Sequence, residues 1–490
     1  MSTDTLSSRV GKAFALERHS IDFIPESERH GRPSNQLTMW FAANVNIVTA
    51  ITGGLAVVFG LPLLWALVAL FVGNLIGTAI MALHSVQGPR LGIEQMIQSR
   101  AQFGYYGATI ALLLGIVVDF GYYVANAIVG GQSFADWLRM PSNLGIVIFS
   151  LITFAVCLVG YDLIHRYQRV ASVILLVMFI YLSVRLLSHT HPISVAMSDH
   201  HFPLGVFVLC VTLATTWNMS YCTYTADYAR YLRKGTSASQ TFWWTYVGAG
   251  LSAYWLFAFG AIAVAIAPKQ SSNFAGYLGS LAGSGLVGVT YAMVIVGLVA
   301  VNVLNLYGGA LTTIGVGSQW KLGMGLRVRA AILVLFTAAG TVLSVFASAS
   351  FLTNFSNFLL FLSYFLFPWS AINLVDFYVV RKQEYSIKDI FLPSGIYGKV
   401  RWGTVIAYLL GVGVEIPFMS TSFYTGPLVS SLGGADISWI VGLFVSGSIY
   451  YTLKLQERSG RTGASVLPSG EVAAVGVPVV AGGSESRYVE

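Results

Sequence analysis

The stretch from Phe207 to Leu232 starts as an apolar run and then changes, midway, into a cluster of polar and aromatic residues. The cluster consists of Thr215, Thr216, Trp217, Asn218, Ser220, Tyr221, Thr223, Tyr224 and Thr225. In hydrocarbon every unsatisfied polar group is costly, so such a cluster is tolerated where it faces protein or a water-filled cavity. It therefore predicts a ligand site, although Ser and Thr also join helices through hydrogen bonds without any ligand.

Two further apolar segments carry amide and aromatic residues at helical spacing. Asp119, Tyr122 and Asn126 fall at positions i, i+3 and i+7, so they share one face of a helix. Asn302 and Asn305 lie one turn apart in a later segment. Amides beside aromatic rings suit a flat heterocycle with N–H and C=O groups around its rim. A single buried Asn more often packs helices, but three of them together with tyrosines favour a ligand site.

The composition indicates what kind of protein carries these residues. Of the 490 residues, 56% are hydrophobic and only 10% are charged, whereas soluble domains have about a quarter of their residues charged. This composition predicts an all-α polytopic membrane protein surrounded by the lipid bilayer. The net charge of +7 comes from basic residues at the ends of apolar segments, which argues against a nucleic-acid partner.

Motifs of enzymes, channels and metal sites are not visible in the sequence. The chain has no HExxH, P-loop or nucleophile-elbow motif, and it lacks the repeated filter of a channel, so we expect neither an enzyme nor a channel. The three cysteines lie in apolar sequence without paired spacing and are predicted to be free, buried thiols. We also expect no metal and no cofactor, because one loop rich in His lacks a ligand framework at metal spacing. Its histidines are His189, His191, His200 and His201.

The distribution of positive charge predicts the orientation of the chain. The apolar segments number twelve, which predicts twelve transmembrane helices. If both termini are cytoplasmic, 24 of the 27 Lys and Arg residues lie on the cytoplasmic side, and only Arg139, Arg185 and Lys269 lie outside. This bias follows the positive-inside rule. We therefore expect a multi-pass protein of the cell membrane with both termini in the cytoplasm, and the compact loops are typical of a bacterial inner membrane.

Two of the twelve segments are interrupted in corresponding places. The first contains Asn44, Asn46 and Thr49, and the sixth carries the polar and aromatic cluster. Interruptions at matching positions of two five-helix halves are typical of inverted-repeat transporters, whose site lies where both helices unwind. The predicted parts are a cytoplasmic tail (1–36), a first five-helix repeat (37–187), a second repeat (202–375), a cytoplasmic linker (376–401), helices 11 and 12 (402–455) and a disordered tail (456–490).

Six short motifs, in order along the chain, resemble those of the nucleobase cation symporters of the purine, cytosine, allantoin and hydantoin permease type. The motifs are IDFIPESERHG, WFAANVNI, GPRLGIEQMIQSRAQFGYYGA, NAIVGGQ, TADYARYL and NVLNLYGG. The resemblance implies twelve helices in the leucine-transporter fold, that is, a five-plus-five inverted repeat with two extra helices. It also implies secondary active uptake of a nucleobase by alternating access.

The resemblance assigns binding roles to individual residues. It implies that a base stacks between Tyr122 and Tyr221, although relatives commonly have Trp at both positions. The substrate therefore stays open between a cytosine- or purine-type base, allantoin or hydantoin, and a vitamin such as thiamine or pyridoxine. The polar residues that would hold the edge of the ring are Asn126, Asn302, Asn305 and, from the break in the first helix, Asn46 and Thr49.

The coupling cation is expected to be a proton or sodium. Sodium-coupled relatives carry hydroxyl side chains where this chain has Ala300 and Val301. Asp119 is the candidate proton carrier, because burial favours the uncharged form of a carboxyl group. Asp227 and Arg230, at the cytoplasmic end of the sixth helix, are candidate gate residues. The sequence leaves the oligomeric state open.

Overall fold

Helices form the regular structure of the computed structural model, which describes residues 22–159, 161–320 and 326–463. Within these ranges no β-strand occurs, and the β-type pairing is limited to two isolated bridges. The chain up to Tyr451 belongs to one compact unit, and the residues from Thr452 onward belong to a second.

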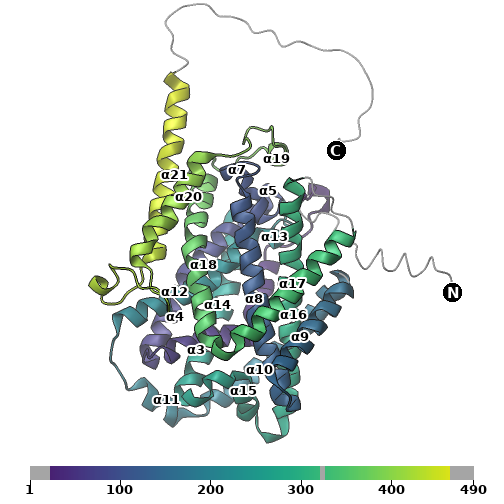
Figure 1. Ribbon diagram of the computed structural model, residues 1–490, viewed down its shortest axis with the longest axis vertical. Helices are drawn as coiled ribbons and strands as arrows, with labels where there is room; N and C mark the ends of the chain where they lie inside the picture. The colour runs from purple at the N-terminus through teal and green to yellow at the C-terminus, as the bar shows by residue number, and fades with distance from the viewer. Residues whose placement is uncertain (1–21, 160, 321–325, 464–490) are drawn as a thin grey trace, which may run out of the picture. The chain divides into compact units, whose positions relative to one another are not determined.

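Seven helices of the described chain are long and apolar enough to cross a bilayer, or eight if one bent pair counts as a single span. The helices that form these spans are α4 (Leu63–Ser85), α8 (Thr109–Leu138), α10 (Tyr161–Leu187), α12 (Leu204–Ser220), α14 (Ala238–Ile266), α16 (Val287–Gln319), α17 (Leu326–Ala347) with α18 (Phe351–Leu374), and the bent pair α2 (Asn35–Asn44) and α3 (Ile47–Val58) (Figure 1). Two shorter apolar helices are α9 (Ser142–Val159) and α20 (Trp402–Glu415). The prediction of a helical, multi-pass membrane protein is confirmed.

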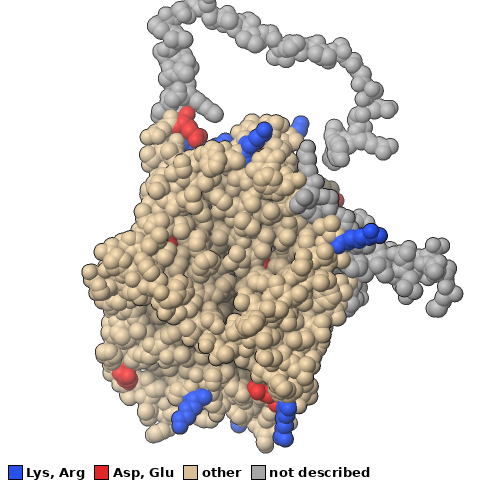
Figure 2. All heavy atoms as spheres, viewed as in Figure 1, with Lys and Arg blue, Asp and Glu red and all other residues tan. Residues whose placement is uncertain are grey.

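The distribution of side chains on the surface agrees with this conclusion. In Figure 2 most of the visible Lys, Arg, Asp and Glu atoms lie towards two opposite ends of the face, and the band between them is almost uncharged. Large apolar side chains such as Val184, Leu335 and Phe346 are exposed. A charged side chain at the centre of a bilayer costs about 2.5 kcal/mol or more, which is why a lipid-facing band is apolar.

The two predicted helix breaks are both present. Helices α2 and α3 are bent by 60° at a break between Asn44 and Ile47. Helix α12 ends at Ser220, a single 3-10 turn η2 (Tyr221–Thr223) follows, and a short helix α13 (Thr225–Ala229) completes the segment. Backbone groups freed at such breaks need polar partners, so each break collects the polar residues of its segment.

Helices α3 and α14 approach each other so closely that their backbones touch. A Cβ atom on Gly53 would lie 2.1 Å from the carbonyl oxygen of Phe257, and one on Gly260 would lie 1.7 Å from that of Ala50. Small residues permit this approach, which is a common way of packing helices in membranes. The second half of the first broken helix is thereby fixed to α14.

We expect Gly53→Ala to lower the free energy of unfolding by about 1–3 kcal/mol, because the added methyl group meets backbone that cannot rotate away. Gly235→Ala is the control, since a Cβ at Gly235 has no atom within 4 Å. Thermal unfolding of both purified variants in one detergent measures the difference. Equal melting temperatures would contradict the close approach of α3 and α14.

The segment between α4 and α8 forms three short helices. They are α5 (Gln87–Leu91), α6 (Gln95–Gln98) and α7 (Arg100–Phe103). Almost every residue of this segment is buried, and that includes its glutamines and Arg100. The segment is therefore part of the packed interior and not a surface loop.

The two predicted tails differ from the structure at their inner ends. Residues 22–36 are folded, because Arg29 donates from Nη1 to the carbonyl oxygen of Pro89 at 2.9 Å and the N–H of Ile24 bonds to Gly92. At the other end, helix α21 (Ser438–Gly463) continues past residue 455, so the prediction of disorder is wrong for 456–463. An ion pair of 2.7 Å between Lys454 and Glu457, one turn apart, supports this extension. Residues 1–21 and 464–490 lie outside the described chain.

A buried carboxylate connects the segment after α18 to its neighbours. Asp376 is fully buried in η6 (Val375–Val380), a π-helical turn. It accepts hydrogen bonds from Gln102 Nε2 (2.9 Å), Tyr385 OH (2.7 Å) and Tyr450 OH (2.6 Å), and it pairs with Arg381 Nε at 2.9 Å. A buried charge is tolerated when it is paired and fully hydrogen-bonded in this way.

Candidate functional site

The two tyrosines predicted to hold a ligand meet at one indole ring. Tyr122 of α8 lies edge-on to Trp217 of α12, with ring centroids 5.5 Å apart and an interplanar angle of 89°. Tyr221 lies edge-on to the same indole at 6.1 Å and 89°. Both tyrosines are buried, and the Tyr122 hydroxyl is bonded to Ser220 Oγ at 2.9 Å. The structure thus brings α8 and the break of α12 together through aromatic rings.

Asn44 connects the two helix breaks and was not among the predicted binding residues. Its Oδ1 accepts hydrogen bonds from Trp217 Nε1 at 2.8 Å and from Tyr221 OH at 3.2 Å. Its Nδ2 donates to the carbonyl oxygens of Trp40 and Ala249. Asn44 and Trp217 could have been included from the sequence, because both belong to the polar interruptions of their apolar segments.

The amide residues of α8 and α16 face each other. Asn126 Nδ2 donates to Asn302 Oδ1 at 3.5 Å, and Asn302 is fully buried. The Nδ2 groups of Asn302 and Asn305 are buried and have no hydrogen-bond partner among the described residues. An unpaired buried donor costs about 1–3 kcal/mol, so these two N–H groups are suited to a ligand that brings carbonyl or ring-nitrogen acceptors.

The two candidates from the first helix break have different surroundings. Asn46 caps α3, since its Oδ1 accepts from the backbone N–H groups of Val48 (2.9 Å) and Thr49 (3.1 Å) while its Nδ2 donates to Ala43. These bonds occupy its amide within the break itself. The hydroxyl of Thr49 is buried without a partner in the described chain and is the freer of the two groups.

Asp119 lies on the same face of α8 as Tyr122 and against α16. A Cβ on Gly308 would lie 3.0 Å from Asp119 Oδ2, and one on Gly309 would lie 3.2 Å from its Cβ. The side chain is only 8% exposed. Because glycine has no side chain, these two positions of α16 leave room for the Asp119 carboxyl group. They lie one to two helical turns after Asn302 and Asn305.

The two candidate gate residues lie in α13 and directly after it, and they make different contacts. Asp227 Oδ1 accepts a hydrogen bond of 2.7 Å from the backbone N–H of Gln95, so it joins α13 to α6. Arg230 is buried, and its guanidinium lies 5.6 Å from the centre of the Tyr231 ring. The contact that ties α13 to the interior thus runs through Gln95.

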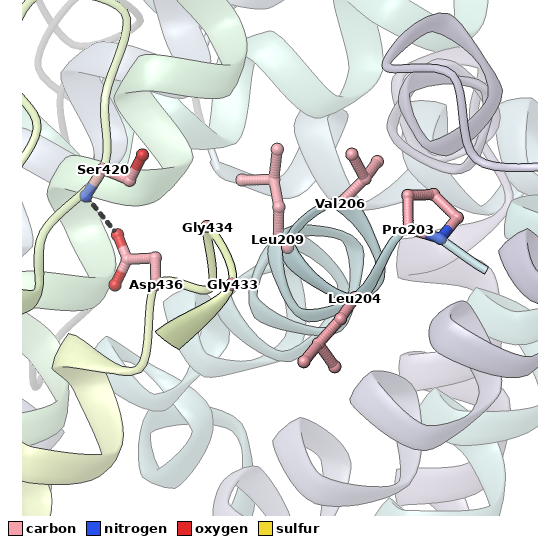
Figure 3. Close-up of a pocket in the computed structure, with 9 residues that line it drawn as sticks. Pro203, Leu204, Val206, Leu209, Ser420, Gly433, Gly434 and Asp436 are labelled. Atoms are coloured by element: carbon pink, nitrogen blue, oxygen red, sulfur yellow. Dashed lines mark hydrogen bonds between the residues drawn. The ribbon is translucent and has the colours of Figure 1, made fainter. Parts of the chain in front are cut away.

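A cavity of about 310 Å³ lies away from this polar cluster (Figure 3). Its wall combines Pro203 and the first turns of α12 with the loop that precedes α21, where Asp436 accepts a hydrogen bond from the backbone N–H of Ser420. Apart from Ser420 and Asp436 the lining residues are apolar or glycine. We place the candidate site at the asparagines and not at this cavity, because the unpaired donors are there.

Known proteins resemble this chain along most of its length. A family model described as "Permease for cytosine/purines, uracil, thiamine, allantoin" matches residues 23–442. "Putative purine-cytosine permease YxlA" of Bacillus subtilis (strain 168) is 39% identical over 449 residues, which cover 91% of this chain and 98% of that protein. "Purine-cytosine permease fcyB" of Emericella nidulans is 27% identical, and the match covers 92% of this chain and 91% of that protein. "Vitamin B6 transporter TPN1" of Saccharomyces cerevisiae is 23% identical, and the match covers 91% of this chain and 88% of that protein.

Solved structures of Mhp1, a nucleobase-cation-symport-1 family transporter, have a similar fold. The inward-facing conformation gives a TM-score of 0.75 at 17% identity and covers 93% of this chain and 99% of Mhp1. The closed conformation with bromovinylhydantoin bound gives 0.71 at 17% identity and covers 91% and 96%. The relatives are permeases and not enzymes, as predicted. Because the family model spans residues 23–442, this chain belongs to the family of permeases for cytosine/purines, uracil, thiamine and allantoin.

Proposed function

We propose that this protein is a secondary active transporter that imports an uncharged nucleobase of the cytosine or purine type together with a cation. The observation that carries the proposal is the pair of unpartnered amide donors, Asn302 and Asn305, on α16. Helix α16 packs against α8, whose Tyr122 contacts Trp217 next to the second helix break, and Asn44 joins the two breaks. A base offers ring acceptors for these donors and flat faces for Tyr122 and Tyr221. Family membership supports the substrate class.

The finer architecture is part of this proposal. Twelve transmembrane helices would form a five-plus-five inverted repeat, as in the leucine transporter, followed by two extra helices. The breaks at α2–α3 and α12–α13 support the repeat, because they occupy the first helix of each half. The excess of positive charge on one side supports a bacterial cell membrane with both termini in the cytoplasm.

A proton is the coupling cation that the residues favour. Ala300 and Val301 offer no side-chain oxygen to sodium, a hard cation that takes oxygen ligands. Asp119 is buried on the ligand-facing side of α8 and can carry a proton between its charged and uncharged forms. Sodium remains the alternative, since backbone carbonyl oxygens at the break of the first helix could also bind it.

A second substrate class is favoured by the tyrosines. The hydroxyl of Tyr122 is bonded to Ser220 and that of Tyr221 to Asn44. The proposed ligand site therefore has smaller rings with a polar edge at the two positions where relatives commonly have Trp. Such a site suits allantoin, a hydantoin, thiamine or pyridoxine, and the family description and the vitamin B6 transporter are in line with this alternative.

A thermal-shift screen of the purified protein tests the proposal. We expect cytosine or a purine, at a hundred times its dissociation constant, to stabilise the fold by about 2.7 kcal/mol. Cytidine is the matched control, because its ribose exceeds a site built for a free base. Two pH values, each with and without sodium, distinguish a proton from sodium. If allantoin, thiamine or pyridoxine stabilises the protein and no base does, the second substrate class replaces the first.

A further inference from the structure

A network of buried polar side chains lies next to α13 and is not used by the proposed ligand site. It joins the last turn of α4 to α5, α6 and α18. All of its members are at most 1% exposed, and they are His84, Gln87, Gln95, Ser370 and Asn373. Buried donors generally face an acceptor, which allows each proton of the network to be placed from the bonds between its members.

The backbone of α13 fixes the orientation of Gln95. The N–H of Ala226 can only donate, and it lies 3.2 Å from Gln95 Oε1. The Nε2 group of Gln95 must then point the other way, towards Gln87 Oε1 at 2.9 Å and His84 Nδ1 at 3.3 Å. Gln87 Nε2 in turn donates to Asn373 Oδ1 at 2.6 Å. One backbone donor thus determines how both glutamines are turned.

The same reasoning determines the protonation of His84. An amide N–H group cannot accept, so Nδ1 must accept from Gln95 and carry no proton. The proton of the neutral ring is then on Nε2, which lies 2.8 Å from Ser370 Oγ. The ring is held flat against Trp369, with centroids 5.1 Å apart and planes 10° apart. Trp369 is fixed by its own bond to Ser99 Oγ at 3.0 Å.

A proton on Nδ1 would place a donor opposite the donors of Gln95 and Gln87. The bond to Gln95 could be restored only if that amide turned its Oε1 towards His84. The N–H of Ala226 would then face Nε2 and lose its acceptor. Burial also disfavours a charge on this ring, so the protonated imidazolium favours an arrangement in which the contact to α13 is broken.

We propose that His84 is a proton-binding latch, at which a proton on Nδ1 turns the Gln95 side chain and releases α13 from the interior. The inference rests on the proposed function, because a secondary active transporter has to change its conformation to carry a substrate across the membrane. It assigns a proton site on α4 in addition to Asp119, the candidate on α8.

The elements that form the network, and those next to it, also contain charged residues that bear on the effect of pH. They are Arg90 on α5, Glu94 before α6, Asp227 on α13 and Asp376 in η6, directly after α18. Helices α12, α14 and α18, which also pack in this region, have no charged residues in their sequences. The closed latch requires an unprotonated Nδ1, so the released arrangement binds the proton more readily. Lowering the pH therefore raises the population of released α13, and raising the pH closes the latch.

Access to Cys222 measures the release without any substrate. Cys222 is fully buried in η2, next to α13, and the chain has two other free cysteines, Cys157 and Cys210. With both replaced by Ser, the rate of alkylation by N-ethylmaleimide is measured between about pH 5 and 8 and divided by the rate in the unfolded chain at the same pH. We expect this ratio to rise as the pH falls, by at most about tenfold per pH unit for one proton.

Three variants test the assignment. His84→Asn keeps an acceptor near the place of Nδ1 and cannot be protonated, so its ratio should stay low at every pH. Gln95→Met removes the side-chain bond to Ala226 while the backbone bond to Asp227 stays, so its ratio should lie above that of the parent at pH 8 and should no longer depend on pH. Gln98→Met is the matched control, because Gln98 lies on the same short helix but donates to Ile93, and it should keep the pH dependence of the parent.

A ratio that does not change with pH in the parent, or that still changes in His84→Asn, would overturn the latch. If His84→Asn does not fold, hydrogen exchange at the amide of Ala226 is measured in the unaltered chain and corrected for intrinsic exchange. Protection of this amide should fall as the pH falls, and protection that does not change with pH would overturn the latch. A latch without base binding in the thermal-shift screen would contradict the transport proposal alone. Base binding without pH-dependent access would contradict the latch alone.

Discussion

Replacement of Asn302 by Ala is expected to weaken the binding of a nucleobase by about 10- to 100-fold, which corresponds to about 1.4–2.8 kcal/mol. The Nδ2 group of Asn302 is buried and unpartnered in the described chain, so a bound base supplies its first acceptor. The variant also removes the Oδ1 that receives Asn126 Nδ2. A ligand concentration that stabilises the parent by about 2.7 kcal/mol should then stabilise the variant by about 1.4 kcal/mol or less.

Titration with the base found in the thermal-shift screen measures this loss. Thr312→Val is the control on the same helix, because the Thr312 hydroxyl donates only to the carbonyl oxygen of Gly308 and has no part in the amide cluster. We expect the control to bind as the parent does. Unchanged affinity of the Asn302 variant would place the base elsewhere, and the cavity beside Asp436 would be the next site to examine.

Asp376→Asn is expected to lower the free energy of unfolding by about 3–5 kcal/mol. The substitution removes the charge that balances the Arg381 guanidinium, 2.9 Å away, in a place where Asp376 itself is fully buried. It also turns one acceptor oxygen into an NH₂ group, either at the Oδ2 position, which accepts from Gln102, Tyr385 and Arg381, or at the Oδ1 position, which accepts from Tyr450. The tyrosine hydroxyls can reverse their bonds, but Gln102 and Arg381 can only donate.

An ion pair with one exposed partner provides the comparison. Glu26 lies 3.4 Å from the buried Arg29, but its own side chain is 54% exposed. A glutamine can still accept the hydrogen bond that Glu26 receives from the backbone N–H of Lys234, so Glu26→Gln should change stability by less than about 1 kcal/mol. Chemical unfolding of both variants in the same detergent gives the two values. If Asp376→Asn were as stable as Glu26→Gln, the buried pair would contribute no more than an exposed one.

The sequence was sufficient to locate the helix breaks and the polar face of α8. Polar residues inside an apolar run are easily recognised in a sequence, because polar groups are costly in hydrocarbon and therefore rare there. The same signal pointed to Asn302, which the structure places opposite Asn126, and to Asn305 one turn further along α16. The positions of the two breaks and of the polar residues in α8 and α16 could therefore be predicted from composition and spacing.

The division of roles within a break could not be predicted. Asn44 and Asn46 are two residues apart and chemically identical, yet Asn46 caps α3 while Asn44 bonds to Trp217 and Tyr221. Which one turns inward depends on the backbone angle at the bend, and that angle is set by packing against α14. The burial of residues 86–104 was likewise missed, since charged and amide residues usually indicate a surface.

The contact of Gly53 and Gly260 with opposing backbone has a consequence for how the protein can change shape. Side chains can change rotamer and let two helices slide, but backbone atoms in direct contact leave no such freedom. The same holds for α2, because a Cβ atom on Gly248 of α14 would lie 2.5 Å from the carbonyl oxygen of Leu37. We therefore expect both halves of the first broken helix to travel with α14 as one body, so that any rotation during a transport cycle is absorbed outside α2, α3 and α14.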